Sequence, residues 1–227
     1  MNSNFIRRWR QSNWVTILIL IATVAVFLGE TLTGGSESPQ VLVNWGAKVD
    51  SLIKLGQWWR LITPVFVHIG FMHIFVNGFT LYYIGGAVEQ MIGHWRFALI
   101  YFLSALSGNL MSFALGGTAA VSAGASTALF GLFGVYIALG VIFDDSYYFR
   151  QTGRQFLMLA AFNLIFDLMA SGIDIWGHIG GLIGGFLLII ALALPGQKLR
   201  KGLAWQITAS VGFLAICAFL YWLGMVR

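Results

Sequence analysis

The sequence predicts an all-α polytopic membrane protein, and three observations support this fold class. Hydrophobic residues make up 59% of the 227 residues and charged residues only 9%, against roughly 25% charged residues in an ordinary soluble domain. Several apolar segments are long enough to cross about 30 Å of hydrocarbon as helices. The basic residues also separate between alternate connections, which is typical of membrane proteins oriented by the positive-inside rule.

Seven apolar segments account for most of the chain. They are predicted at residues 14–30, 64–84, 95–115, 124–143, 155–172, 175–194 and 204–224. The first could imitate a secretory signal peptide, but no small-residue cleavage site follows residues 28–30, so we expect a retained helix. The fifth is interrupted by Asn163 and Asp167, yet the charge pattern requires it.

The basic residues predict the orientation of these helices. With seven spans, nine of the 13 Lys and Arg residues fall on one side: Arg7, Arg8, Arg10, Arg96, Arg150, Arg154, Lys198, Arg200 and Lys201. The other side receives Lys48, Lys54, Arg60 and Arg227. The positive-inside rule then puts the N-terminus in the cytoplasm and the C-terminus outside. The net charge of +5 is therefore interpreted as a topology signal, and we expect no nucleic-acid partner.

Residues 31–63 form the one long connection. They contain Pro39 and the tryptophans Trp45, Trp58 and Trp59, and indole rings prefer the membrane interface. Loops of this length are usually functional or mobile linkers. We expect an amphipathic piece lying in the outer interface, with a disordered extracellular loop as the alternative.

The chain divides into three parts along its length. Residues 1–13 are a predicted cytoplasmic segment, residues 14–194 a helical core that includes the 31–63 loop, and residues 195–227 a linker with an additional helix. The single cysteine, Cys217, lies in that last helix and can form no intrachain disulfide.

Four polar residues from three predicted helices converge on one depth. With the N-terminus inside, the second, fourth and sixth helices run inward from the outer face. His73, Asn77, Ser126 and His178 lie near their starts, on the order of 5 to 15 Å below the outer surface at 1.5 Å per residue. Polar groups inside a membrane are functional candidates by default.

A nucleophile and its base are the simplest interpretation of Ser126 and His178. A serine hydroxyl is a weak nucleophile until an adjacent base takes its proton. The two helices must pack closely for this, and small residues permit it. Gly177, Gly181 and Gly185 on one helix would face Gly124, Ala128 and Gly131 on the other. Taken alone, these glycines would indicate only that the helices pack closely, and not a catalytic site.

Acyl transfer also needs hydrogen-bond donors for the developing oxyanion. The Ser126 amide, at the start of its helix, is one candidate. His73 and Asn77 share a helical face and supply two more, although a histidine with an asparagine four residues later also suits a structural link between helices. Asp174 more simply caps the sixth helix, and Asp167 is interpreted as a structural polar group, so we prefer a Ser–His dyad.

A zinc site is the less favoured alternative. His68, His73 and His178 could gather at one depth, but the His-Glu-x-x-His signature is absent and no glutamate lies beside the histidines at 68 and 73. We expect neither a metal nor a cofactor.

These residues resemble the rhomboid family of intramembrane serine proteases. The resemblance covers the first six helices, and its motifs come in the family's order. They are Trp59-Arg60, His68-x4-His73-x3-Asn77, Gly85-Gly86-Ala87-Val88-Glu89, Gly124-Ala125-Ser126 and Gly177-His178-x2-Gly181-x3-Gly185. It implies a rhomboid-like six-transmembrane-helix bundle, with a seventh C-terminal helix as found in some members.

The resemblance also implies roles for these residues. Ser126 would attack a substrate peptide bond, and His178 would be the general base and then the acid. His73, Asn77 and the Ser126 amide would form the oxyanion hole. Gly124, Phe130, Gly181 and Gly185 would support the site, and Trp59, Arg60 and Glu89 would be structural.

Two positions depart from the family pattern. The usual glycine after the serine is Thr127, and the usual tyrosine four residues after it is Phe130. A β-branched residue beside the nucleophile is stiffer and bulkier than glycine. Phe130 could still stack on the His178 ring but lacks the hydroxyl. We expect retained activity with altered rate or specificity.

The expected function is an endopeptidase of the bacterial cell membrane that cleaves single-span membrane proteins within or near their transmembrane segment. Its partners are then those substrates and the lipid bilayer. The main alternative is an inactive rhomboid-like scaffold that binds transmembrane helices. A small transporter is weakly supported, because no inverted repeat is evident.

Overall fold

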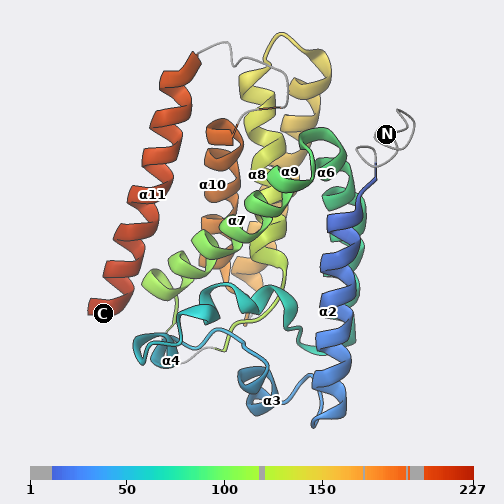
Figure 1. Cartoon of the computed structure of the whole chain (residues 1–227), viewed down its shortest axis with the longest axis vertical. Helices are drawn as coiled ribbons and strands as arrows, with labels where there is room; N and C mark the ends of the chain where they lie inside the picture. The colour runs from blue at the N-terminus through green and yellow to red at the C-terminus, as the bar shows by residue number, and fades with distance from the viewer. Residues whose placement is uncertain (1–11, 118–120, 171, 193, 195–201) are drawn as a thin grey trace, which may run out of the picture.

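The fold is a bundle of long helices with short helices packed against one end (Figure 1). This computed structural model describes residues 12–117, 121–170, 172–192, 194 and 202–227. The long helices are α2 (Trp14–Leu32), α5 (Gly70–Thr80) continuing through η3 (Leu81–Gly85) into α6 (Gly86–Ile92), α7 (His94–Leu115), α8 (Ser126–Ile142), α9 (Tyr147–Met169), α10 (Ile175–Leu192) and α11 (Gly202–Val226). Six of the basic residues used for the topology, Arg7, Arg8, Arg10, Lys198, Arg200 and Lys201, lie outside the described residues.

An apolar helical membrane protein is confirmed. Among the described residues, five helical segments are long and apolar enough to cross a membrane, namely 14–32, 70–92, 94–115, 175–192 and 202–226, and α8 is a shorter apolar helix. The helix α9 is not among them; it contains Arg150, Arg154, Asn163 and Asp167. Its 23 residues nevertheless give a length of about 35 Å at 1.5 Å per residue.

The boundaries predicted for the second and fifth segments were wrong. The second was expected at 64–84, but Thr63–Phe66 is a separate 3-10 helix (η2), and the long helix begins at Gly70, whose φ of +73° is easily adopted only by glycine. That helix continues to Ile92 through one π-helical turn. The fifth was expected at 155–172, but α9 begins at Tyr147, where the Ser146 hydroxyl accepts from the Phe149 amide.

The 31–63 connection is folded, so the disordered-loop alternative is wrong. It contains α3 (Pro39–Asn44), α4 (Asp50–Lys54) and η1 (Trp58–Leu61). Arg60 is buried at its centre and donates to the carbonyl oxygens of Val43 and Ala47, both at 2.8 Å, and to Gln57 Oε1 at 2.7 Å. One guanidinium thus closes the loop, while Trp58 and Trp59 stay exposed.

The core is centred on α10, which packs between α7 and α8 by two rows of glycines. Gly181 and Gly185 face α8, where an added Cβ would collide with the backbone oxygens of Thr127 and Gly131. Gly180 and Gly184 face α7, where an added Cβ would collide with Met111 and the Ser107 carbonyl oxygen at position 180, and with the Ser107 hydroxyl at position 184. Small residues let membrane helices approach to backbone contact, so this packing fixes where α8 and α10 begin relative to each other.

Glu89 connects the starts of two helices at the end of the bundle that lies away from the short helices. Its carboxylate accepts from the Val15 amide at 3.0 Å, from the Thr16 amide and hydroxyl at 2.8 and 2.6 Å, and lies 2.6 Å from His94 Nδ1. These partners belong to the first turns of α2 and α7, so Glu89 holds both helix starts against α6.

We predict that Gly185→Ala destabilises the fold. The new Cβ would lie 2.6 Å from Gly131 Cα, and overpacking of this kind typically costs about 1–3 kcal/mol, more than the roughly 1 kcal/mol gained in helix propensity. The matched control is Gly212→Ala in α11, where nothing lies within 4 Å of the added atom. Thermal unfolding in detergent should show a lower midpoint for Gly185→Ala alone; equal midpoints would contradict the packing argument.

Candidate active site

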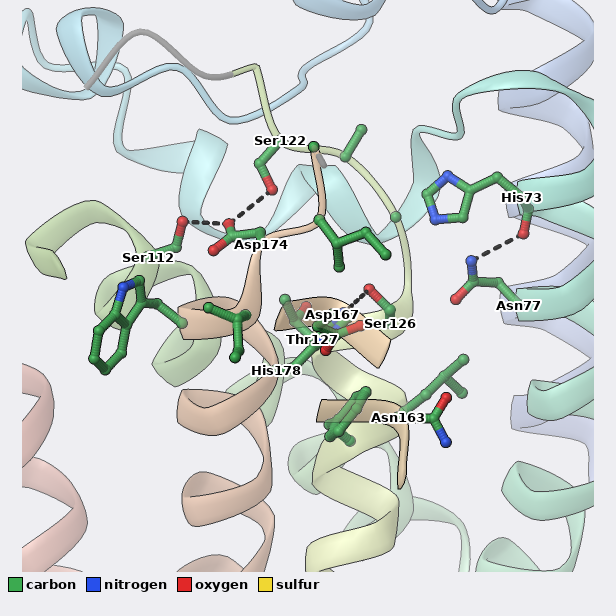
Figure 2. Close-up of a pocket in the computed structure, with 18 of the residues that line it drawn as sticks. His73, Asn77, Ser112, Ser122, Ser126, Thr127, Asn163, Asp167, Asp174 and His178 are labelled. Carbon is green, nitrogen blue, oxygen red and sulfur yellow. Dashed lines mark hydrogen bonds and ion pairs between the residues drawn. The ribbon is translucent and has the colours of Figure 1, made fainter. Parts of the chain in front are cut away.

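A cavity of about 570 Å³ opens at the end of the bundle where α5, α8 and α10 begin. It is lined by His73 and Asn77 of α5, Ser126 and Phe130 of α8, Asp167 of α9 and His178 of α10, among others. Figure 2 shows the polar members of this set, among them His73, Ser126 and His178, around one space. The four polar residues that the sequence placed at one depth therefore line one cavity.

Ser126 and His178 are hydrogen-bonded. The Ser126 hydroxyl lies 2.7 Å from His178 Nε2 (Figure 2). Ser126 is the first residue of α8, and His178 lies in the first turn of α10 and is buried. The glycine contacts between the two helices hold this pair in place. A base at this distance can accept the hydroxyl proton as the oxygen attacks.

Two further side chains contact the His178 ring, one on its face and one at its second nitrogen. Phe130 stacks on it with the ring centroids 4.2 Å apart and the planes at 9°, as we expected. Asp167 Oδ2 lies 2.6 Å from His178 Nδ1, which we did not expect, because the sequence interpretation made this carboxyl a structural group. No spacing rule links residues 167 and 178; only the packing of α9 against α8 and α10 brings them together.

The segment before Ser126 requires glycine at position 124. Gly124 has φ of +128°, and an added Cβ would lie 2.7 Å from His73 Cε1. Its amide donates to the Pro64 carbonyl at 2.9 Å, and the Ala125 amide donates to His68 Nε2 at 3.4 Å. The chain is thus held close against the start of α5, which brings His73 next to the serine.

His73 and Asn77 line this space, and each has an N–H group that can donate a hydrogen bond. The Ile69 amide donates to His73 Nδ1 at 3.2 Å, so the proton of a neutral ring sits on Nε2, the atom close to Gly124. Asn77 is buried and donates one amide hydrogen to the His73 carbonyl at 2.9 Å. The second amide hydrogen remains for another acceptor.

Asp174 caps α10, as the sequence indicated. It accepts from the Gly177 amide at 3.0 Å, from the Ser122 hydroxyl at 3.0 Å and from the Ser112 hydroxyl. Lys48 pairs with Ser122 through two backbone hydrogen bonds of 2.8 and 3.1 Å. Asp174 therefore connects the starts of α8 and α10 to the end of α7 and to the first loop.

Thr127 fills the space between α7 and α10. Its Cβ and Cγ2 lie against Gly108 and Gly177, and its hydroxyl oxygen is buried with no hydrogen-bond partner among the described residues. Much of the Thr127 side chain, which the usual glycine would lack, therefore packs at the interface between α7 and α10.

The histidines do not form a metal site within the described residues, which contain no group of three or more His, Cys, Asp or Glu side chains able to hold a metal ion. The His68 and His73 rings lie 5.1 Å apart, but the two ring nitrogens of His68 contact the Phe66 carbonyl and the Ala125 amide. His68 is a buried support for the segment before Ser126.

Comparison with known proteins points to one family. The Rhomboid domain family model matches residues 55–195. The rhomboid protease GluP of Bacillus subtilis (strain 168) is 40% identical over 206 residues, which cover 88% of this chain and 39% of GluP. The putative rhomboid protease YdcA of the same organism is 38% identical over 133 residues, 59% of this chain and 66% of YdcA.

A eukaryotic relative shows the same similarity. Rhomboid-like protease 1 of Toxoplasma gondii is 35% identical over 181 residues, 78% of this chain and 60% of that protein. The matches thus cover between 39 and 66% of the length of these three relatives.

We predict that His68 makes the stability depend on pH. Burial, with His73 as a smaller cause, lowers the pKa of His68 from 6.5 to about 3. Below pH 6.5 the unfolded chain takes up a proton that the folded chain does not, so the free energy of unfolding falls as the pH is lowered. His68→Gln, whose amide oxygen can still accept from Ala125, should flatten this dependence between pH 6.5 and 5 in thermal unfolding. An unchanged slope would contradict the assignment.

Proposed function

Because the chain belongs to the rhomboid family, we propose that it is an intramembrane serine endopeptidase in which Ser126 is the nucleophile and His178 the general base. The observation that carries this proposal is the 2.7 Å hydrogen bond between the two side chains, inside a cavity of an otherwise apolar bundle. Such a pair needs no cofactor for acyl transfer.

The reaction follows from the positions of the groups. His178 Nε2 takes the proton of the Ser126 hydroxyl while the oxygen attacks the substrate carbonyl carbon. The negative charge on the carbonyl oxygen is met by His73 Nε2–H, the second Asn77 amide hydrogen and the Ser126 amide. The protonated His178 then donates to the leaving amine, and a water molecule, activated by His178 in turn, hydrolyses the acyl-enzyme.

The substrates we propose are single-span membrane proteins. A peptide bond can enter the site only when its backbone is extended, and a helix in lipid gives up its internal hydrogen bonds at high cost. The favoured substrates therefore have Gly, Pro or other helix-weakening residues at the cleavage position. Apolar cavity walls from Val76, Leu129, Phe133 and Phe166 suit side chains of a transmembrane segment.

We also propose that the site faces the outside of a bacterial cell membrane and that the N-terminus is cytoplasmic. Arg96 and Arg150 lie in the first turns of α7 and α9, and Arg154 lies one turn further along α9, all toward the end of the bundle opposite the cavity. Lys48, Lys54 and Arg60 lie at the cavity end. The positive-inside rule assigns the end richer in basic residues to the cytoplasm. Residues 1–13, 14–194 and 195–227 are then the cytoplasmic segment, the six-helix core and the linker with the added helix; 1–11 and 195–201 lie outside the described residues.

A scaffold that binds transmembrane helices without cleaving them is the second candidate. It is favoured by Thr127, which lines the cavity where the family usually has glycine. A serine-directed fluorophosphonate distinguishes the two: an enzyme is labelled at Ser126 only when His178 is present, whereas a scaffold binds helices without labelling.

We predict that Ser126→Ala and His178→Ala each abolish cleavage of a single-span substrate by the purified protein in liposomes. Each variant removes one partner of the proton transfer. Ser210→Ala in α11, where the hydroxyl donates only to the Gln206 carbonyl of its own helix at 2.8 Å, is the matched control and should cleave at the wild-type rate. Cut sites are mapped by mass spectrometry, and cleavage persisting in Ser126→Ala would end the proposal.

We further predict that His73→Ala and Asn77→Ala slow cleavage without abolishing it. Removal of one oxyanion donor typically lowers the rate by about 100- to 1,000-fold. Fluorophosphonate labelling and cleavage should fall together, while helix binding is retained. Rates within a few-fold of wild type would show that these side chains only connect helices.

A further inference from the structure

We propose that Asp167 is a positioning residue for His178, which holds the imidazole of the Ser–His pair in its orientation and tautomer. The inference deepens the proposed function and rests on it. It comes from one contact that neither the motifs nor their spacing predicted, between a carboxylate of α9 and the base of α10 (Figure 2).

The two contacts of His178 define which nitrogen carries its proton. A neutral imidazole has one N–H and one lone pair. Asp167 Oδ2 lies 2.6 Å from Nδ1 and, when ionised, can only accept. The proton is therefore placed on Nδ1, and the lone pair of Nε2 faces the Ser126 hydroxyl at 2.7 Å. This is the tautomer that a general base needs.

The burial of Asp167 supports a specific role in the site. Its neighbours in α9 are exposed, Phe166 by 58% and Leu168 by 74%, whereas Asp167 is 8% exposed. The carboxyl thus faces inward on a helix that otherwise presents large apolar side chains outward. A carboxylate buried among helices is tolerated when a donor is paired with it, and here the His178 ring is that donor.

Asp167 also supplies a restraint that Phe130 cannot. The phenyl ring stacks on His178 at 4.2 Å and 9°, which fixes the plane of the imidazole but offers no hydrogen bond. Rotation of the ring within that plane and the choice of tautomer are left to polar groups at its edges. Asp167 contacts Nδ1 and Ser126 contacts Nε2, the two ring nitrogens.

The proton balance needs no further reactant. The Ser126 proton moves to Nε2 as the oxygen–carbon bond forms, which makes His178 an imidazolium. Asp167 stays ionised and stabilises that cation through the Nδ1–H hydrogen bond. The Nε2 proton then passes to the leaving amine nitrogen as the carbon–nitrogen bond breaks, and His178 returns to its neutral form.

The test compares Asp167→Asn with Asp167→Glu and with the control Asp145→Asn, which makes the same chemical change at an exposed residue before α9. We expect Asp167→Asn to lower kcat on the order of 10²- to 10⁴-fold, because its amide group can donate to Nδ1 and favour the wrong tautomer. KM should change little. Asp167→Glu, which restores the carboxylate, should recover part of kcat, and Asp145→Asn should match wild type.

A second readout does not depend on activity. Nitrogen-15 NMR of histidine-labelled protein, with His178 assigned by its loss in His178→Gln, reports which ring nitrogen is protonated. We expect Nδ1 in the wild type and a shift toward Nε2 in Asp167→Asn. A wild-type His178 protonated on Nε2, or a kcat of Asp167→Asn within a few-fold of wild type, would overturn the inference, and the wild-type spectrum decides the matter even if the asparagine variant fails to fold.

The two proposals fail in different ways. Absence of cleavage and of Ser126 labelling in the wild type would remove the proposed function while leaving the tautomer measurement to stand alone. Normal wild-type cleavage with an Asp167-independent kcat would remove only the positioning role of Asp167.

Discussion

The contact between the backbones of α8 and α10 is the constraint on which the rest of the site depends. A hydroxyl and an imidazole on separate helices reach 2.7 Å because the helices that carry them pack closely, with few side chain atoms between them. Gly181 and Gly185 permit this packing against Thr127 and Gly131. The second glycine row, Gly180 and Gly184, packs against Ser107 and Met111 of α7, so α10 has little freedom to rotate and His178 keeps its direction.

Buried polar groups are the second constraint, because in an apolar protein each is costly without a partner. Most partners here join different elements. Glu89 joins α2, α6 and α7, Arg60 joins the parts of the first loop, and Asp174 joins α7, the start of α8 and α10. The same residues that would be costly alone therefore set the relative positions of the helices, and the cavity is built between them.

The sequence was sufficient for the parts of the site that lie on regular patterns. Ser126, His178 and the row from Gly177 to Gly185 follow from helical spacing and depth, and the membrane fold follows from composition. Asp167 could not be assigned, because its partner is eleven residues away across a helix end and the start of α9 was misplaced. For the 31–63 loop the sequence indicated only an amphipathic piece. Its fold around Arg60 was not predicted, since it depends on one buried guanidinium rather than on local periodicity.

The pairing of Asp167 with His178 also bears on how the chain enters the bilayer during synthesis. A carboxylate within a membrane is costly unless it is paired, and Asp167 lies near the end of α9, which also carries Arg150, Arg154 and Asn163. The compensating imidazole arrives only with α10, which begins at Ile175, shortly after α9 ends at Met169. These two helices are therefore suited to leave the translocon as a hairpin, so that one contact serves both biogenesis and the finished protein.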